Sequence, residues 1–189
     1  MHVLEAIQTR RSIRRFRPDP IEQQVIENLL EITTLAPSAK NEQPWRFVVL
    51  TGEAKMELLE RVDSALQDAI ANERPTGSLR RSLQSMREAP VLILVFNGVP
   101  RTGLPQEVQY AKFLVDTQSL GAAIQTMLLA AQSMGLGTLW ICDVLYAAEQ
   151  IRSFVGTGDE LVAAVAMGLP AESPVARPRK AWSNVTTFL

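Results

Sequence analysis

Apolar and polar residues alternate along the chain in two kinds of block, one typical of strands and one typical of helices. Short continuous apolar runs predict buried strands at 47–50, 91–96, 139–142 and 161–167. Longer stretches with apolar residues at helical spacing predict helices at 3–9, 52–72, 107–134 and 147–154. No repeat, low-complexity tract or long linker divides the chain, so we expect one domain over residues 1–189. Helices outnumber strands and the two mix, which favours an α/β or α+β fold with about four strands.

Another helix is predicted to begin near residue 19. Asp19 is a residue type that caps helices, Pro20 suits the first helical position, and Glu22 completes a capping-box pattern. The apolar residues that follow at helical spacing are Val25, Leu29, Ile32 and Ala36. Pro37 is expected to end this helix.

The predicted helix at 107–134 is apolar on nearly all sides. Residues 117–142 form a stretch of 26 residues without a charge, in which polar pairs recur every seven residues. A lipid-exposed helix would not favour such a polar stripe, so we predict a buried helix and no membrane span. One small domain rarely covers a long helix that is apolar all round. We therefore predict a homodimer in which this helix packs against its counterpart.

The composition excludes several kinds of catalytic site. The 189 residues include one His, His2, and one Cys, Cys142. An intrachain disulfide and a multi-Cys metal site are therefore excluded, and a His-based nucleophile system or His-ligated metal is not expected. The formal net charge of −1 argues against nucleic-acid binding. The N-terminal residues lack the pattern of a secretory signal, so a cytoplasmic location is expected.

Arginine is used far more than lysine and is concentrated at two places. The sequence has 15 Arg and 4 Lys, and five of the arginines fall within residues 10–17. A second basic group near the C-terminus contains Arg177, Arg179 and Lys180. Guanidinium groups can grip a phosphate at two points, so residues 10–16, with Ser12 among the arginines, form a candidate anion site. A solvated basic turn would have the same composition.

Two further segments carry candidate binding residues. Residues 36–45 lie between a predicted helix and a predicted strand, and Ser38, Asn41 and Gln43 offer polar side chains there. Residues 135–141 contain two glycines that would let the backbone approach a flat ligand closely. The alternatives are an ordinary helix-to-strand connection and a glycine helix stop leading into a strand.

Taken in order, these segments resemble those of the FMN-dependent nitroreductase family. The matching residues are 10–16, 36–45, 125–131, 135–141 and 176–180, so the resemblance spans nearly the whole chain. It implies an α+β sandwich with a central, mostly antiparallel sheet flanked by helices. It also implies a homodimer with a long central dimer helix and FMN bound at the subunit interface.

The resemblance further implies a role for each matching residue. Residues expected to hold the FMN phosphate, ribityl chain and N1/C2=O edge from one subunit are Arg10, Arg11, Ser12, Arg14, Arg177 and Arg179. Residues expected to reach the same FMN from the partner subunit are Pro37, Ser38, Ala39 and Asn41. Backbone groups of Leu139, Trp140 and Ile141 are expected to face the N5/O4 side. The pyrimidine edge would be contacted by one of Asn72, Arg74, Arg80 and Arg81.

The implied activity is an FMN-dependent oxidoreductase with NAD(P)H as co-substrate. It would reduce nitroaromatic or quinone-type acceptors by a ping-pong two-electron mechanism, with no catalytic side chain, because the cofactor carries the redox chemistry. The alternatives are a flavin-fragmenting or dehalogenating enzyme, a protein that binds or stores FMN without turnover, and an anion-binding adaptor without cofactor. The chain departs from the family at Cys142-Asp143, where Glu-Gly or Gly is common, and we expect Cys142 to be buried and inert. It is also short for the family, so a substrate lid is expected to be small or absent.

Overall fold

The computed structural model describes residues 2–100 and 103–189. Within them, the α-helices are α1 (Val3–Thr9), α2 (Gln23–Thr33), α3 (Gly52–Ala71), α4 (Leu79–Glu88), α5 (Gln106–Ser133) and α6 (Ala148–Val155). The strands are β1 (Trp45–Thr51), β2 (Val91–Asn97), β3 (Gly137–Ile141) and β4 (Glu160–Gly168). Three short 3₁₀ helices are η1 (Ala39–Asn41), η2 (Asp143–Ala147) and η3 (Trp182–Val185).

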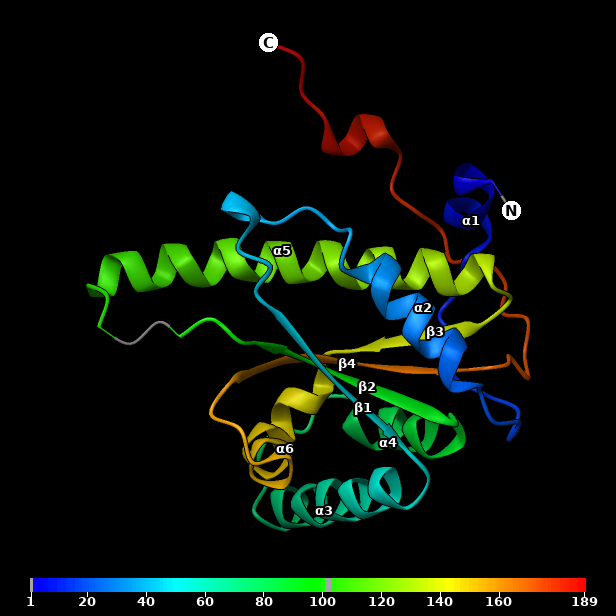
Figure 1. Cartoon of the computed structure of the whole chain (residues 1–189), viewed down its shortest axis with the longest axis vertical. Coiled ribbons are helices and arrows are strands. Elements are labelled where there is room, and N and C mark those ends of the chain that lie inside the picture. The colour runs from blue at the N-terminus through cyan, green and yellow to red at the C-terminus, as the bar shows by residue number, and fades with distance from the viewer. Residues whose placement is uncertain (1, 101–102) are drawn as a thin grey trace.

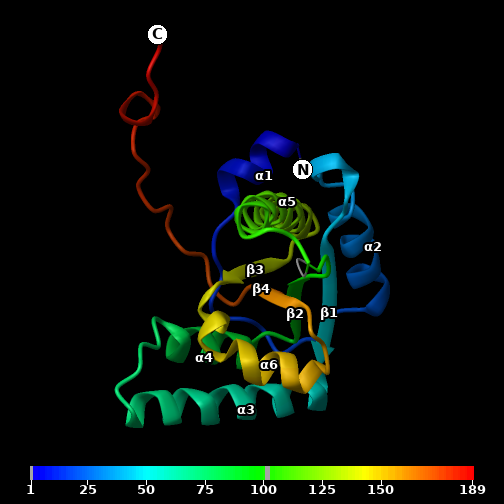
Figure 2. The same cartoon turned by 90° about the vertical axis from the view of Figure 1, so that its left-hand side faces the viewer.

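The four strands form one antiparallel sheet in the order β1-β2-β4-β3. Helices α2 and α5 cover one face of the sheet, and α3, α4 and α6 cover the other, as the two orthogonal views show (Figure 1, Figure 2). This arrangement confirms the predicted α+β sandwich with a central antiparallel sheet. The two edge strands are β1 and β3, and β3 forms one wall of the candidate site.

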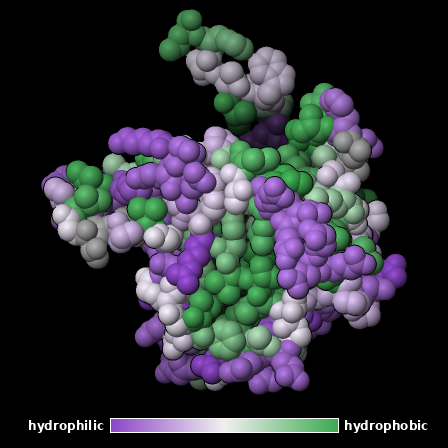
Figure 3. Space-filling view, viewed as in Figure 1, coloured by the Kyte–Doolittle hydropathy of each residue, from purple (hydrophilic) through white to green (hydrophobic). Residues whose placement is uncertain are grey.

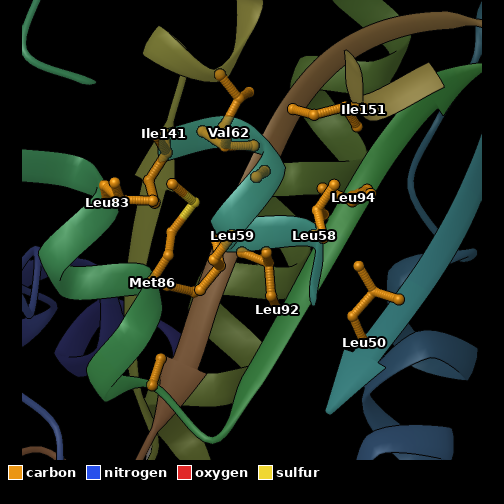
Figure 4. Packing of buried hydrophobic residues seen from close by; sticks show 14 of the residues in the cluster. Leu50, Leu58, Leu59, Val62, Leu83, Met86, Leu92, Leu94, Ile141 and Ile151 are labelled. Carbon is orange, nitrogen blue, oxygen red and sulfur yellow. The ribbon is translucent and has the colours of Figure 1, made fainter. Parts of the chain in front are cut away.

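Each face of the sheet has its own hydrophobic core, because successive strand side chains point to opposite faces. In β2, Leu92 and Leu94 pack against α3 and α4, whereas Ile93 and Val95 pack against α2 and α5. Figure 4 shows Leu92 and Leu94 beside Leu58 and Leu59 of α3. All seven residues of β2 are buried, which explains why this strand reads as a continuous apolar run.

The helix predicted to begin at Asp19 begins later. Helix α2 starts at Gln23 with Glu22 as its N-cap residue, so the expected cap at Asp19 is wrong. The Asp19 carboxylate instead accepts hydrogen bonds from the Arg17 guanidinium at 2.9 and 3.1 Å. Because the Asp19 carboxylate is occupied by Arg17, it does not cap the helix.

Helix α4 is the one α-helix that the hydrophobic pattern missed. It is short and carries three arginines, so its average character is polar. Leu79, Leu83 and Met86 nevertheless lie at helical spacing and are buried against α3 and the sheet. This omission matters because α4 forms the second wall of the candidate site.

Helix α5 crosses the width of the molecule in Figure 1 and leaves apolar side chains exposed. Tyr110 is 66% exposed, and Val108 and Leu114 are also exposed at the N-terminal half of the helix. The space-filling view shows further apolar surface on the face along which β1 runs (Figure 3). In the part of the chain that the structure describes, no helix has the length and apolar character that a membrane crossing requires.

Candidate functional site

The arginine-rich segment 10–17 lies along the outer edge of β3. The Ile13 N–H donates a 2.9 Å hydrogen bond to the Thr138 carbonyl oxygen, and Ser12 pairs with Thr138 as an isolated parallel bridge. The later part of the segment pairs with the residues that follow β4: the Arg17 N–H donates to the Leu169 oxygen at 2.9 Å. Ile13 and Phe16 are buried in the core, so the backbone is fixed at both sides while the intervening arginines face outward.

A cavity of about 360 Å³ lies at this segment. Its lining residues are Arg10, Arg11, Ser12, Arg14, Pro174, Val175, Arg177 and Arg179. The structure thus brings together the two arginine clusters that lie at opposite ends of the sequence. All six residues expected to hold the phosphate end of FMN from one subunit line this cavity, which we call the arginine cavity, whereas Arg15 and Lys180 of the two basic groups do not.

In the part of the chain that the structure describes, the guanidinium groups of this cavity are not paired with acidic side chains. Among the described residues, no carboxylate oxygen lies within 4.0 Å of any of the five guanidinium groups. Their neighbours Arg15 and Arg17 are instead paired with Glu88 and Asp19, each at 2.9 Å. Burial lowers the pKa of Arg10, and the adjacent charges of Arg179 and Arg11 lower it further. Such unbalanced positive charge favours binding of an anion.

A second cavity of about 390 Å³ adjoins the first, because Arg14 and Arg177 line both. Its walls are the start of α4 and the free edge of β3. The remaining lining residues are Ser78, Arg81, Ser82, Ser85, Leu139, Trp140, Ile141, Cys142 and Asp143. We call it the β3 cavity.

The hydrogen bond from Ile13 to Thr138 shows which backbone groups of β3 face this cavity. Backbone groups of alternate residues in a strand point to the same edge. Since the Thr138 carbonyl points away from β4, the N–H and C=O of Trp140 also point to the free edge, while those of Leu139 and Ile141 point towards β4. Of the three residues predicted here, Trp140 offers its backbone to a ligand.

Four residues were candidates for the pyrimidine edge of a flavin, and the structure separates them. Arg81 lines the β3 cavity. Asn72 and Arg74 both bind Asp68. The Asn72 side-chain amide donates to the Asp68 backbone oxygen at 2.8 Å, and the Arg74 guanidinium donates to the Asp68 carboxylate. Arg80 is absent from the described lining of either cavity. The serines of α4 were missed because α4 itself was not predicted.

Cys142 does not occupy the position expected for it. Its side chain is exposed and lines the β3 cavity, so the prediction of a buried cysteine is wrong. The strand ends at Ile141, and the chain turns into η2 immediately after Cys142, which brings the thiol to the surface. Partial desolvation raises the pKa of the Cys142 thiol, and the Asp143 carboxylate raises it further. A protonated thiol is a weak nucleophile, which is consistent with an inert Cys142. That part of the expectation stays a prediction.

The loop at 36–45 lies across α5, away from both cavities. None of its described residues lines either cavity, so the structure does not bring Pro37, Ser38, Ala39 and Asn41 together with the arginines of the same chain. The Ala39 N–H donates to Ser119 Oγ of α5 at 3.3 Å.

The loop also holds strained backbone. Lys40, Asn41 and Gln43 adopt left-handed φ angles of 53°, 55° and 50°. Non-glycine residues rarely adopt this conformation, and clusters of it occur where a loop is shaped for function. The strain supports a binding role for the loop.

A buried polar network fixes this loop to α5 and β2. Asp116 is 1% exposed and accepts a 3.1 Å hydrogen bond from the Asn97 side-chain amide at the end of β2. The Lys112 ammonium bridges the Asp116 carboxylate and Glu42, the latter at 2.7 Å. These contacts raise the pKa of Lys112 despite the opposing effect of burial.

Comparisons with known proteins agree with this geometry. Residues 7–169 match the model of the nitroreductase family. The chain is 34% identical over 146 residues to the 5,6-dimethylbenzimidazole synthase of Rhodospirillum rubrum, covering 71% of this chain and 65% of that enzyme. It is 31% identical to a protein of Methanothermobacter thermautotrophicus provisionally named NADH dehydrogenase/NAD(P)H nitroreductase, covering 94% of this chain and 82% of the other.

Solved structures give the same result. The BluB-like flavoprotein of Clostridium difficile 630 superposes with a TM-score of 0.84 at 25% identity, covering 100% of this chain and 99% of that one. A provisionally named nitroreductase of Desulfovibrio desulfuricans, solved in complex with FMN, superposes with a TM-score of 0.77 at 29% identity and covers 100% and 97% of the two chains. With the sheet order, the arginine cavity and the family match in agreement, the chain belongs to the nitroreductase family.

Proposed function

We propose that the protein is an FMN-dependent oxidoreductase that uses NAD(P)H to reduce nitroaromatic or quinone-type acceptors. The observation that carries this proposal is the junction of the two cavities. Five arginines whose guanidinium groups have no acidic partner among the described residues surround one cavity, and this cavity adjoins a second one along a free strand edge. FMN has the matching shape, with a phosphate at one end and a flat ring bearing hydrogen-bonding groups at the other.

The residues present fit such a cofactor. Arg10, Arg177 and Arg179 would hold the phosphate, and Ser12 would contact the ribityl chain. The backbone N–H of Trp140 would donate to the N5/O4 side of the ring. Arg81, across the β3 cavity on α4, is the candidate for the pyrimidine edge.

Arg14 lines both cavities and therefore has a special place in this proposal. A guanidinium near the N1 side of the ring stabilises negative charge there and favours reduction. When bound, FMN would accept a hydride from NAD(P)H and pass two electrons to a second substrate, which gives ping-pong kinetics. The side chains bind and orient the reactants, so none of them needs to act as a catalytic acid or base.

We further propose a cytoplasmic homodimer in which the loop 36–45 of one subunit reaches the cavities of the other. The loop is strained and fixed to α5, yet lies away from the cavities of its own chain. Exposed apolar side chains along the same side of the molecule support a second subunit, including Tyr110 of α5, and Val3 and Leu4 of α1, which packs at the other end of α5.

The test is an anaerobic titration of the purified protein after incubation with FMN. We expect retained flavin absorbance, bleaching of that absorbance by NADH or NADPH, and recovery on addition of a nitroaromatic compound or a quinone. A protein that takes up no FMN would contradict the proposal. Uptake without bleaching by either nucleotide would indicate storage of FMN in place of turnover.

A second candidate is a flavin-fragmenting enzyme, which the similarity to the Rhodospirillum rubrum synthase favours. The nitroreductase-type relative is matched over a larger share of both chains, which is why we prefer the reductase. The two are distinguished by incubating the protein with reduced FMN and oxygen. Formation of 5,6-dimethylbenzimidazole, detected by mass spectrometry, would support the fragmenting enzyme.

A further inference from the structure

The C-terminal residues form an extended arm that leaves the body of the molecule (Figure 2). This arm carries Arg177 and Arg179, two of the five arginines of the arginine cavity. In residues 173–189, every hydrogen bond that the structure describes is made within the arm itself. Something before residue 173 must therefore determine where the two arginines lie.

The last hydrogen-bonded connection between the arm and the body is made by Glu172. Its carboxylate oxygen Oε1 accepts the backbone N–H of Arg14 at 2.5 Å and that of Arg15 at 3.2 Å. Next to it, the Ala171 N–H donates to the Arg15 oxygen at 2.9 Å. Hydrogen bonds to an ionised carboxylate are stronger than those between neutral groups. Glu172 thus holds the arm against the same segment that supplies Arg10 and Arg14.

The chain between this contact and the two arginines is short and stiff. Pro174 follows Glu172 by two residues and Pro178 stands between Arg177 and Arg179, and each proline fixes its own φ angle. Pro174 and Val175 line the arginine cavity, so the arm follows its wall from Glu172 to Arg177. A chain held at one end keeps the groups beyond it at a high local concentration.

We infer that Glu172 is a positioning residue for the phosphate end of the cofactor, which it serves by holding Arg177 and Arg179 opposite Arg10 and Ser12. The inference rests on the proposed function, because it takes the anion to be the phosphate of FMN. Glu172 is not part of the described lining of the cavity, and its carboxylate is occupied by two backbone N–H groups. It acts on the ligand through the arm.

The first test compares Glu172→Ala with Glu172→Gln, using FMN and riboflavin as ligands. Riboflavin has the same ring and ribityl chain but no phosphate. We expect Glu172→Ala to weaken FMN binding about tenfold and leave riboflavin binding unchanged, because the arginines are no longer held at the phosphate. Glu172→Gln keeps an oxygen that can accept both N–H groups, so it should retain most of the FMN affinity. Equal weakening of both ligands would indicate general damage to the fold and overturn the inference.

The second test is a double-mutant cycle with Arg177→Ala/Arg179→Ala. If Glu172 acts through these arginines, adding Glu172→Ala to that variant should cause no further loss of FMN affinity. Additive losses would overturn the inference. Failure of the wild-type protein to bind FMN would instead overturn the proposed function, whereas wild-type affinity in Glu172→Ala would overturn this inference alone.

Discussion

The backbone N–H of Ile13 donates a 2.9 Å hydrogen bond to the carbonyl oxygen of Thr138. This one contact joins the arginine-rich segment to the edge of the sheet. It also shows which backbone groups of β3 are free of β4: those of Thr138 point outward, and so do those of Trp140 two residues on. The arginine-rich segment and the backbone groups that we propose to face the ring therefore lie along the same strand edge.

Gly137→Ala should disturb this junction. A Cβ at Gly137 would lie 2.9 Å from Ile13 Cγ1 and 3.1 Å from Ile13 Cβ, too close for either residue to stay in place. We expect a loss of about 1–3 kcal/mol in the free energy of unfolding, the usual cost of overpacking a core. FMN binding should weaken too, since the arginine segment must shift. Urea denaturation and a fluorescence titration with FMN would measure the two effects.

Gly158→Ala is the matched control for this substitution. Gly158 has no heavy atom within 4 Å of an added Cβ, and its φ lies outside the left-handed region. It should change stability and FMN binding little. Equal effects of the two substitutions would contradict a specific role for the Gly137–Ile13 contact.

Much of the fold could be predicted from sequence because buried positions recur with the period of a strand or a helix. Strand β2 is buried on both faces and reads as an uninterrupted apolar run, whereas the buried residues of α5 recur at helical spacing along one side. Helix α4 was missed because it has only three apolar side chains, all of them buried, while its three arginines dominate the pattern. The start of α2 was misplaced because the pattern at Asp19 could not show that Arg17 already holds that carboxylate.

The candidate site was predictable in its residue types but not in their pairing. Five arginines fall in residues 10–17; the family resemblance singled out Arg10, Arg11 and Arg14, but composition alone gives no reason for that choice. The fold distinguishes them, because Glu88, which lies 73 positions from Arg15, neutralises that residue and leaves Arg14 without an acidic partner. Contacts over such separations leave no local signal. The same holds for Ser78 and Asp143, which come together at the β3 cavity.

Arg14→Ala and Arg15→Ala form a matched pair that tests this distinction. Arg14 lines both cavities, so its removal should weaken FMN binding by about tenfold or more and lower the reduction potential of the bound flavin. Arg15 is directed at Glu88 and lies outside the described lining of both cavities, so its removal should change FMN affinity by about twofold at most. FMN titration and anaerobic potentiometry would measure the effects. Similar losses in both variants would mean that the segment contributes only general positive charge.

Glu88→Gln should show a defined pH dependence. Hydrogen bonds from Gln84, Arg15 and the Phe16 N–H to the Glu88 carboxylate hold its pKa below its usual value. A carboxylate whose pKa is lower in the folded state than in the unfolded state stabilises the fold at neutral pH. That stabilisation is lost as the pH falls through the folded-state pKa.

The variant should therefore be less stable than the wild type by up to about 1 kcal/mol at pH 7. The difference should shrink towards zero as the pH falls through the folded-state pKa of the wild-type carboxylate, which lies below the usual value for Glu. Urea denaturation of both proteins at several pH values would measure this. A difference that stays constant down to low pH would show that the charge of Glu88 contributes nothing.

Lys112→Met should release the loop that holds Ser38, Ala39 and Asn41. The Lys112 ammonium connects Glu42 of the loop to the buried carboxylate of Asp116. Its removal leaves Asp116 with the Asn97 amide as its remaining described side-chain partner, and an uncompensated buried charge of this kind costs about 3–5 kcal/mol. We expect lower stability by urea denaturation and faster amide hydrogen exchange in residues 38–43.

Glu57→Gln, which breaks an exposed ion pair of the same helical spacing with Arg61, is the control and should cost under about 0.5 kcal/mol. Unchanged exchange in the loop of Lys112→Met would mean that Ser119 alone holds it, and the buried network would then have no part in shaping the site.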